Sequence, residues 1–125
     1  MKVKFTEKQM EFLSITHMNE NYHETKFHSY YERKTLDKFF SAYYGFEGGT
    51  VRYTKKLYRL LLELCMVGDH SQEWVYHEQI KVEEMNNLIK NLSKAVGLDK
   101  PAFEVIPMTS REEWWSEHYQ PSEDS

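Results

Sequence analysis

The stretch TLDKFFSAYYGFEGGTVRYTKKLYRLLLELCMVG, residues 35–68, decides the fold of this chain. In its first half, apolar residues recur at the three- and four-residue spacing of one helical face: Leu36, Phe39, Phe40, Tyr43 and Tyr44. Gly45 ends that pattern, and residues 48–49 are a glycine pair that favours a turn. From Lys55 until Gly68 the helical period returns, in Leu57, Leu60, Leu61 and Leu64. The stretch therefore predicts two helices joined by a short glycine turn, a helical hairpin.

The segment before the hairpin predicts a further helix. Thr6 and Gln9 have the spacing of a capping box, so a helix is expected to begin at about Glu7. The side chains that this helix should bury are Met10, Leu13 and His17. Ser29 and Glu32 repeat the capping-box spacing just ahead of the hairpin, which marks the start of its first helix.

A third helical stretch follows the hairpin. Asp69 or Ser71 can cap its start, and Gly97 followed by Pro101 ends it. One stripe along this stretch collects apolar residues: Val75, Val82, Met85, Ile89, Leu92 and Val96. The spacing predicts one continuous helix.

The expected fold is mainly α: a compact helical bundle of four to five helices in a single domain, residues 1–119. Thr109 can cap the last of these helices. Residues 1–5 and 102–106 resemble short strands, and they could pair as one small two-stranded sheet against the helices. Residues 120–125 are a polar tail that is expected to be disordered.

Composition is typical of a folded cytosolic protein. The chain has 125 residues, of which 40% are hydrophobic and 15% aromatic, and this is too apolar for intrinsic disorder. Its longest aliphatic run, residues 60–62, is far shorter than the roughly 20 apolar residues of a membrane span. The first residues lack the apolar run of a secretory signal. A lone cysteine, Cys65, cannot form an internal disulfide, so a cytoplasmic location is expected.

Charge is distributed unevenly along the chain. The net charge is -4, but residues 31–60 carry seven basic and three acidic side chains, and residues 61–125 carry five basic and thirteen acidic ones. A basic helical hairpin, residues 33–59, could bind nucleic acid because lysine and arginine neutralise phosphates. The side chains that would make these contacts are Arg52, Lys55, Lys56 and Arg59.

The periodicity weakens the nucleic-acid interpretation. The rings of Phe39, Phe40, Tyr43 and Tyr44 share a helical face with Leu36, so they are expected to be buried. Burying each ring is worth about 1.5–3 kcal/mol, more than an exposed ring returns. Lys55 and Lys56 then lie on the solvated back of an amphipathic helix. A nucleic-acid-binding regulator therefore stays an alternative rather than the main prediction, since dedicated binders are usually basic.

One constellation could bind a metal ion. His70, Glu73 and His77 are three and four residues apart, which places them on one helical face as a two-histidine, one-carboxylate site requires. Surface histidines beside acidic residues explain the same pattern, so a metal-dependent enzyme is a weaker alternative. Cys65 lies among leucines, which is typical of an inert core cysteine rather than a nucleophile. No catalysis and no cofactor are expected.

The acidic C-terminal region is the part that the expected core explains least. Neighbouring residues on a helix point about 100° apart, so Trp114 and Trp115 cannot both face inward. A terminal helix that docks Trp115 and Tyr119 into the domain would explain these residues, but tryptophan and tyrosine among acids are also typical of protein-binding hot spots. The predicted partner-binding residues are Glu112, Glu113, Trp114, Trp115, Glu117 and Tyr119. The main prediction is a small cytosolic protein-binding regulator, an inhibitor or adaptor, whose target could be a nucleic-acid-processing protein. Self-association is left open, and no membrane contact is expected.

Overall fold

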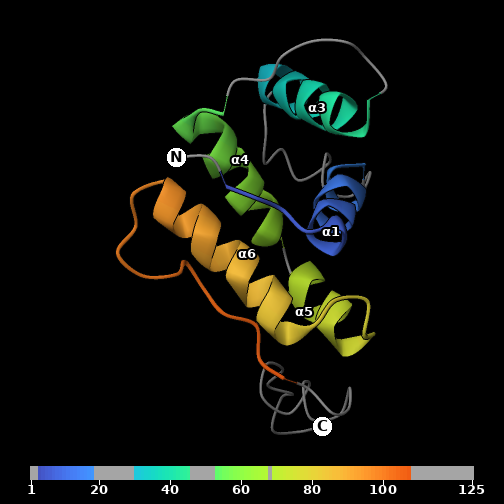
Figure 1. Ribbon diagram of the computed structural model, residues 1–125, viewed down its shortest axis with the longest axis vertical. Helices are drawn as coiled ribbons and strands as arrows, with labels where there is room; N and C mark the ends of the chain where they lie inside the picture. Colours follow the sequence, from blue (N-terminus) through green and yellow to red (C-terminus); the bar gives the residue numbers. More distant parts are fainter. Residues whose placement is uncertain (1–2, 19–29, 46–52, 68, 108–125) are drawn as a thin grey trace, which may run out of the picture.

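The computed structural model describes residues 3–18, 30–45, 53–67 and 69–107, and these residues form five α-helices and no β-strand (Figure 1). The helices are α1 (Glu7–Met18), α3 (Tyr30–Tyr44), α4 (Lys55–Cys65), α5 (His70–Tyr76) and α6 (Val82–Ala95). The prediction of a mainly α, compact helical bundle is confirmed. None of the helices in the described residues is long and apolar enough to cross a membrane.

Helix α4 lies at the centre of the bundle and packs against α1, α3 and α6. It begins at Thr54, whose hydroxyl accepts a hydrogen bond of 3.1 Å from the Leu57 backbone N–H. Its leucines face three neighbouring helices at once, so Leu60, Leu61 and Leu64 are fully buried. The two helices of the predicted hairpin, α3 and α4, do pack against each other.

The predicted capping box at the start of α1 is confirmed. The Gln9 backbone N–H donates to the Thr6 hydroxyl at 3.2 Å, and the Thr6 backbone N–H donates to the Gln9 side-chain oxygen at 2.9 Å. The Gln9 amide nitrogen also donates to the Glu84 carbonyl at 2.8 Å, which ties the start of α1 to the first turn of α6. As predicted, α1 buries Met10, Leu13 and His17.

The apolar face of α3 is only partly buried. Leu36, Phe39 and Phe40 are buried as predicted, whereas Tyr43 and Tyr44 are each 44% exposed. The expected burial of the two tyrosines is therefore wrong. Helical spacing gives the direction of a side chain but not whether a neighbouring helix covers it, and the last turn of α3 faces an open groove beside α1.

The single helix expected after the hairpin is two helices, α5 and α6, separated by residues 77–81. Glu78 has a left-handed backbone, with φ of 58°, and reverses the chain. The Gln79 N–H donates to the Trp74 carbonyl at 2.9 Å and the Glu78 N–H to the Val75 carbonyl at 3.0 Å, the pair of bonds that closes a Schellman C-cap. The sequence did not predict the end of α5, because the left-handed position after a helix is usually occupied by glycine and here it is Glu78.

The end of α6 matches its prediction. Gly97 has φ of 92°, and the N–H groups of Gly97 and Leu98 donate to the carbonyls of Lys94 and Ser93 at 3.0 and 2.9 Å. This is the same C-cap as at α5, with glycine in the left-handed position where it is not strained.

The two-stranded sheet expected between residues 1–5 and 102–106 is absent from the described parts of both segments, which form no strand. Side chains satisfy their backbone groups instead. The Val3 N–H donates to the Tyr58 hydroxyl at 2.9 Å. The backbone of residues 105–106 pairs with side-chain amides of α5 and α6. The predicted last helix and the tail, residues 109–125, lie outside the described residues, as does the Ser29 cap.

Candidate functional site

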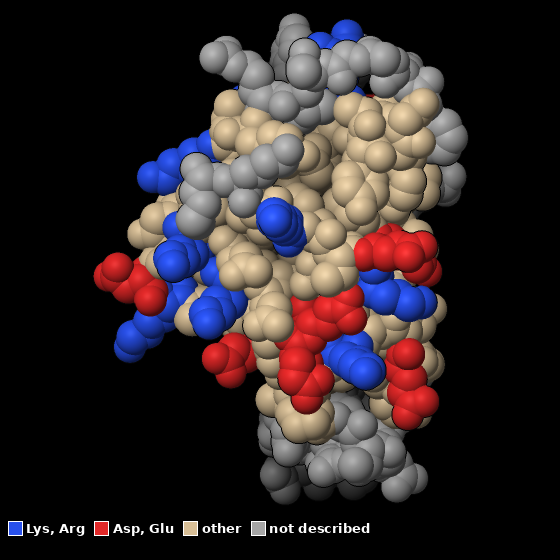
Figure 2. Space-filling view, in the orientation of Figure 1, with Lys and Arg blue, Asp and Glu red and all other residues tan. Residues whose placement is uncertain are grey.

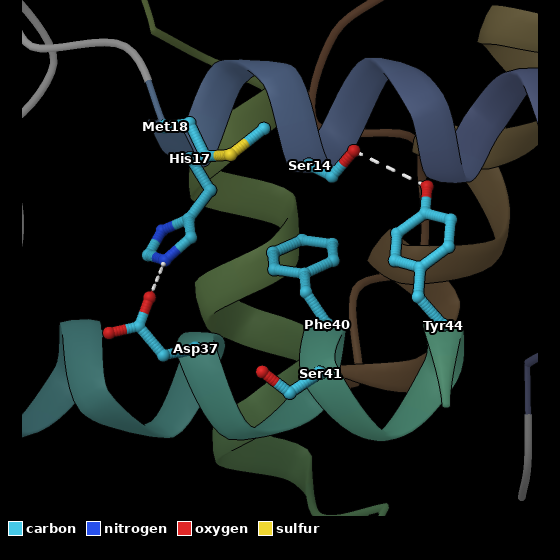
Figure 3. A pocket seen from close by; sticks show the side chains of 7 residues that line it. All are labelled: Ser14, His17, Met18, Asp37, Phe40, Ser41 and Tyr44. Carbon is cyan, nitrogen blue, oxygen red and sulfur yellow. Dashed lines mark hydrogen bonds and ion pairs between the residues drawn. The ribbon is translucent and has the colours of Figure 1, made fainter. Parts of the chain in front are cut away.

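Helices α1 and α3 both pack against α4, and a groove of about 420 Å³ lies between them (Figure 3). The side chains of α1 that line it include Ser14, His17 and Met18, and those of α3 include Asp37, Phe40 and Tyr44. His17 faces Asp37, and Ser14 faces Tyr44, so the two helices run antiparallel along the groove.

A histidine–aspartate contact bridges one end of the groove. The His17 Nε2 lies 2.6 Å from the Asp37 Oδ1, although the two residues are twenty positions apart in the sequence. The histidine ring is buried and stacks on the Phe40 ring with centroids 5.4 Å apart, whereas the Asp37 side chain is 69% exposed. The contact therefore holds α1 and α3 together and leaves a carboxylate at the mouth of the groove.

The other end of the groove is bridged by hydroxyl groups. The Ser14 and Tyr44 hydroxyls lie 3.4 Å apart, and the Ser14 hydroxyl also donates to the Glu11 carbonyl at 3.1 Å. Between the two bridges the buried Phe40 ring lies at the base (Figure 3). The groove is thus aromatic in its middle and polar at both ends.

Exposed apolar side chains lie in the groove lining and beside it on α1 and α3. Met18 of α1, which is 67% exposed, and Tyr44 of α3, which is 44% exposed, line the groove. Ile15 is three residues before Met18 and on the same side of α1, and the Tyr43 ring packs edge-on against Tyr44 with centroids 5.1 Å apart. We refer to Ile15, Met18, Tyr43 and Tyr44 as the groove rim. Such side chains, at a groove with an aromatic middle and polar ends, suit the binding of an apolar side chain from a partner.

The predicted metal-binding residues are not brought together. The His77 Nε2 lies 3.2 Å from the Glu73 carboxylate on the surface of α5. His70 packs elsewhere, with its ring centroid 5.5 Å from that of Phe12 and 6.2 Å from that of Trp74. In the part of the chain that the structure describes, no three histidine, cysteine or acidic side chains are grouped as metal ligands.

Burial changes the protonation of His70. Desolvation lowers the pKa of the imidazole, and the charges of Asp69 and Glu73 oppose this shift in part. Its Nε2 is buried without a hydrogen-bond partner among the described residues. A neutral ring between Phe12 and Trp74 is therefore the form that the folded protein favours.

Cys65 is fully buried in the core beside the leucines of α4, as the sequence predicted. Burial raises the pKa of its thiol far above the usual range, because the apolar surroundings penalise the thiolate. The thiol therefore stays protonated and has the character of a packing residue.

The basic residues of α4 are exposed, as predicted, and one of them, Lys55, lies beside the end of α6. A Cβ atom at Gly97 would lie 3.3 Å from the Lys55 Nζ, which places the start of α4 against the end of α6. Figure 2 shows lysine and arginine side chains gathered over this side of the molecule. We call the α4/α6 basic surface the set of exposed residues Lys55, Lys56, Arg59, Lys90, Lys94 and Lys100. Glu63 partly offsets it, at 3.6 Å from the Arg59 Nε.

Other predicted site residues lie outside the described part of the chain. These are Arg52 of the basic hairpin and the predicted partner-binding residues Glu112, Glu113, Trp114, Trp115, Glu117 and Tyr119. Sequence reasoning missed the groove, although it placed His17 on the buried face of its helix. His17 and Asp37 are twenty positions apart and on different helices, so no local sequence pattern links them.

Comparison of the chain with protein-family models, with curated proteins and with solved structures found no match. Evidence on its function therefore comes from the groove, the exposed side chains and the distribution of charge.

Proposed function

We propose that this chain is a small, non-catalytic regulatory protein, located in the cytosol, that acts as an inhibitor or adaptor by binding another protein. One observation carries the proposal. Among the described residues, two of the seven exposed large hydrophobic side chains, Met18 and Tyr44, line the groove, and two more, Ile15 and Tyr43, lie beside it on α1 and α3. Methionine and tyrosine are enriched at protein interfaces, and apolar side chains gathered at one groove are a better indication of a partner than scattered ones.

The groove supports a side-chain-in-groove mode of binding. Its volume of about 420 Å³ lies within the roughly 300–1,000 Å³ of typical ligand pockets. Two antiparallel helices with an aromatic base can accept the apolar face of a third helix. The Asp37 carboxylate at one end and the Tyr44 hydroxyl at the other would then orient the partner.

The acidic C-terminal region is proposed as a second contact with the same partner. Residues 61–125 carry a net charge of -8, from five basic and thirteen acidic side chains. Glutamates at 112, 113 and 117 around Trp114 would suit a basic groove, as found on nucleic-acid-processing proteins, where acids compete with the substrate for arginine and lysine.

The experiment is a pull-down from host lysate with and without nuclease, followed by affinity measurement with the purified partner. We expect Met18→Lys to weaken binding at least about tenfold, the range of a moderate hot spot. Met66→Lys is the matched control, because Met66, the C-cap residue of α4, is 47% exposed and does not line the groove. Equal affinities of the two variants would contradict binding at the groove.

The acidic region is tested separately. Replacing Trp114, Glu112 and Glu113 by alanine should weaken binding to the partner without lowering the melting temperature. Undiminished binding would remove this region from the proposal and leave the groove as the docking site.

A nucleic-acid-binding regulator is the second candidate. The observation that favours it is the proximity of the start of α4 to the end of α6, because this adds the α6 lysines to those predicted from the hairpin. The affinity for an oligonucleotide should fall steeply with salt and should fall further when Lys55, Lys56 and Arg59 are changed to glutamine. Lys34→Gln with Lys38→Gln on α3 is the control, since both lysines are exposed but lie on another helix. Affinity that is insensitive to salt would exclude this candidate.

A further inference from the structure

The chain after α6 turns back and runs alongside that helix toward α5 (Figure 1). Side chains hold the main chain of this segment, residues 102–106. The Asn86 amide donates to the Val105 carbonyl at 3.0 Å and accepts from the Val105 N–H at 2.8 Å. The Gln72 amide makes the same pair of bonds with Ile106, at 2.8 and 3.0 Å. The Ser93 hydroxyl accepts from the Ala102 N–H at 2.9 Å.

Each amide side chain satisfies both backbone groups of one residue. A neighbouring β-strand would offer a residue the same combination of one donor and one acceptor. Asn86 on α6 and Gln72 on α5 therefore bind Val105 and Ile106 through groups that every residue except proline has. Main-chain hydrogen bonds of this kind supply affinity in strand-addition peptide sites, and side-chain pockets supply specificity.

The site is built into the domain rather than formed by surface side chains. Gln72 is 7% exposed and Ser93 is 1% exposed. The Ser93 hydroxyl donates to the Ile89 carbonyl at 2.6 Å, which fixes its direction toward the segment. Within the segment, Val105 is the one fully buried side chain, and Phe103 and Ile106 are half-buried. We call the part of α5 and α6 that holds this segment the α5/α6 groove. It combines main-chain recognition with burial of one apolar side chain, Val105.

The connection to α6 is short and exposed. The chain leaves the helix through Gly97, whose φ is 92°, and residues 97–102 are all exposed. Two backbone bonds close the turn, from the N–H groups of Gly97 and Leu98 to carbonyls of the last turn of α6. Straightening this turn would carry the segment away from its own domain; this removes Val105 from the core but leaves the contacts between the helices in place.

We propose that the α5/α6 groove is a peptide-binding site that can accept residues 102–106 from a second copy of this chain. The second copy is the occupant because its segment is chemically identical to the one that the groove already holds. Exchange of an identical element is a low-cost route to a dimer. In a single chain the tethered segment has an effective concentration on the order of millimolar, so it outcompetes the segment of a second copy. Exchange therefore becomes measurable only when the tethered segment is impaired. This site is separate from the α1/α3 groove and does not depend on the proposed function.

Two full-length variants test the exchange when they are mixed. Val105→Asp impairs the segment but leaves the groove intact, whereas Gln72→Ala with Asn86→Ala impairs the groove but leaves the segment intact. Light scattering after size exclusion should give the monomer mass of 15.1 kDa for each variant alone. The equimolar mixture should give a species of twice that mass, with the intact segment of one variant in the intact groove of the other.

The control mixture pairs Val105→Asp with a chain that carries all three substitutions and so offers no intact segment. It should remain at the monomer mass. A dimer in this control, or a monomer in the test mixture while circular dichroism shows both variants folded, would overturn the proposal. Should Val105→Asp prevent folding, Val105→Ser replaces it, because serine also removes the apolar side chain that the pocket holds but introduces no charge.

Discussion

At the scale of single residues, the backbone of Glu78 has an unfavourable conformation. Its φ of 58° lies in the left-handed region, which costs a residue with a Cβ atom about 1–2 kcal/mol relative to the right-handed one. The structure tolerates this because the reversal ends α5 and lets Ile80, which is 3% exposed, pack into the core. Gly97 makes the same reversal at the end of α6 without that cost.

Replacing Glu78 by glycine should therefore stabilise the protein. We expect the free energy of unfolding to rise by about 1 kcal/mol and the melting temperature by about 3–6 °C. Thermal unfolding followed by circular dichroism measures both. Gly97→Ala is the matched opposite, since alanine there is strained and its Cβ would lie 3.3 Å from the Lys55 Nζ. A melting temperature that is unchanged or lower in Glu78→Gly would show that the left-handed conformation carries no strain.

His70 gives a pH dependence to stability. Burial lowers its pKa below the ordinary value of 6.5, so at acidic pH the unfolded chain binds a proton that the folded chain does not. This part of the stability is complete above pH 6.5 and declines as the pH falls toward the folded-state pKa. Asp69 and Glu73, which oppose the shift, reduce the decline.

The substitution His70→Phe should remove that decline, because phenylalanine keeps the ring contacts with Phe12 and Trp74 but cannot be protonated. Urea unfolding at pH 7.5 and at pH 5.5 measures the difference in stability for each protein. The wild-type chain should lose more stability between the two pH values than the variant does. An equal loss in both would assign the pH dependence to other groups.

At the scale of helices, local capping and tertiary contacts meet at the start of α1. Gln9 is buried and bonds both to the Thr6 N–H within its own capping box and to the Glu84 carbonyl on α6. Thr54 caps α4 through one local bond to the Leu57 N–H. Thr54 only caps its own helix, whereas Gln9 caps α1 and also joins it to α6. Comparing the two therefore shows how much stability the additional bond between helices contributes.

We expect Gln9→Ala to lower the free energy of unfolding by about 2–3 kcal/mol, since it removes two hydrogen bonds and leaves the Thr6 backbone N–H without its partner in a part-buried place. Thr54→Ala, the control, should cost about 1 kcal/mol, the usual contribution of an N-cap. Chemical denaturation of both variants gives the comparison. If Gln9→Ala costs no more than Thr54→Ala, the bond between α1 and α6 contributes nothing measurable.

At the scale of the whole molecule, α4 joins the bundle into one unit because it contacts α1, α3 and α6. We predict that Leu60→Ala, in the middle of α4, destabilises the protein by about 2–5 kcal/mol through the cavity it leaves. Unfolding should remain a single transition when circular dichroism and tryptophan fluorescence are compared. Leu98→Ala is the control, as Leu98 is exposed and its loss should change stability by less than about 0.5 kcal/mol. Two separate transitions would contradict the single domain predicted for residues 1–119.

The sequence by itself determined the local features of this protein. The start of α1 at Thr6 and Gln9, the end of α6 at Gly97 and the buried faces of α4 and α6 could all be predicted. Each of them depends on residues within a few positions of one another, through capping bonds, backbone conformation or helical period.

Only the tertiary structure decided the features that join distant residues. The reversal at Glu78 is accepted because Ile80 packs into the core, and residues 102–106 are held by side-chain amides rather than by a second strand. Likewise, the contact of His17 with Asp37 helps to form the α1/α3 groove. The approach of Lys55 to Gly97 brings the basic residues of α4 close to the end of α6. A pattern along the chain gives the direction of a side chain, whereas the neighbour that it meets depends on how the helices pack.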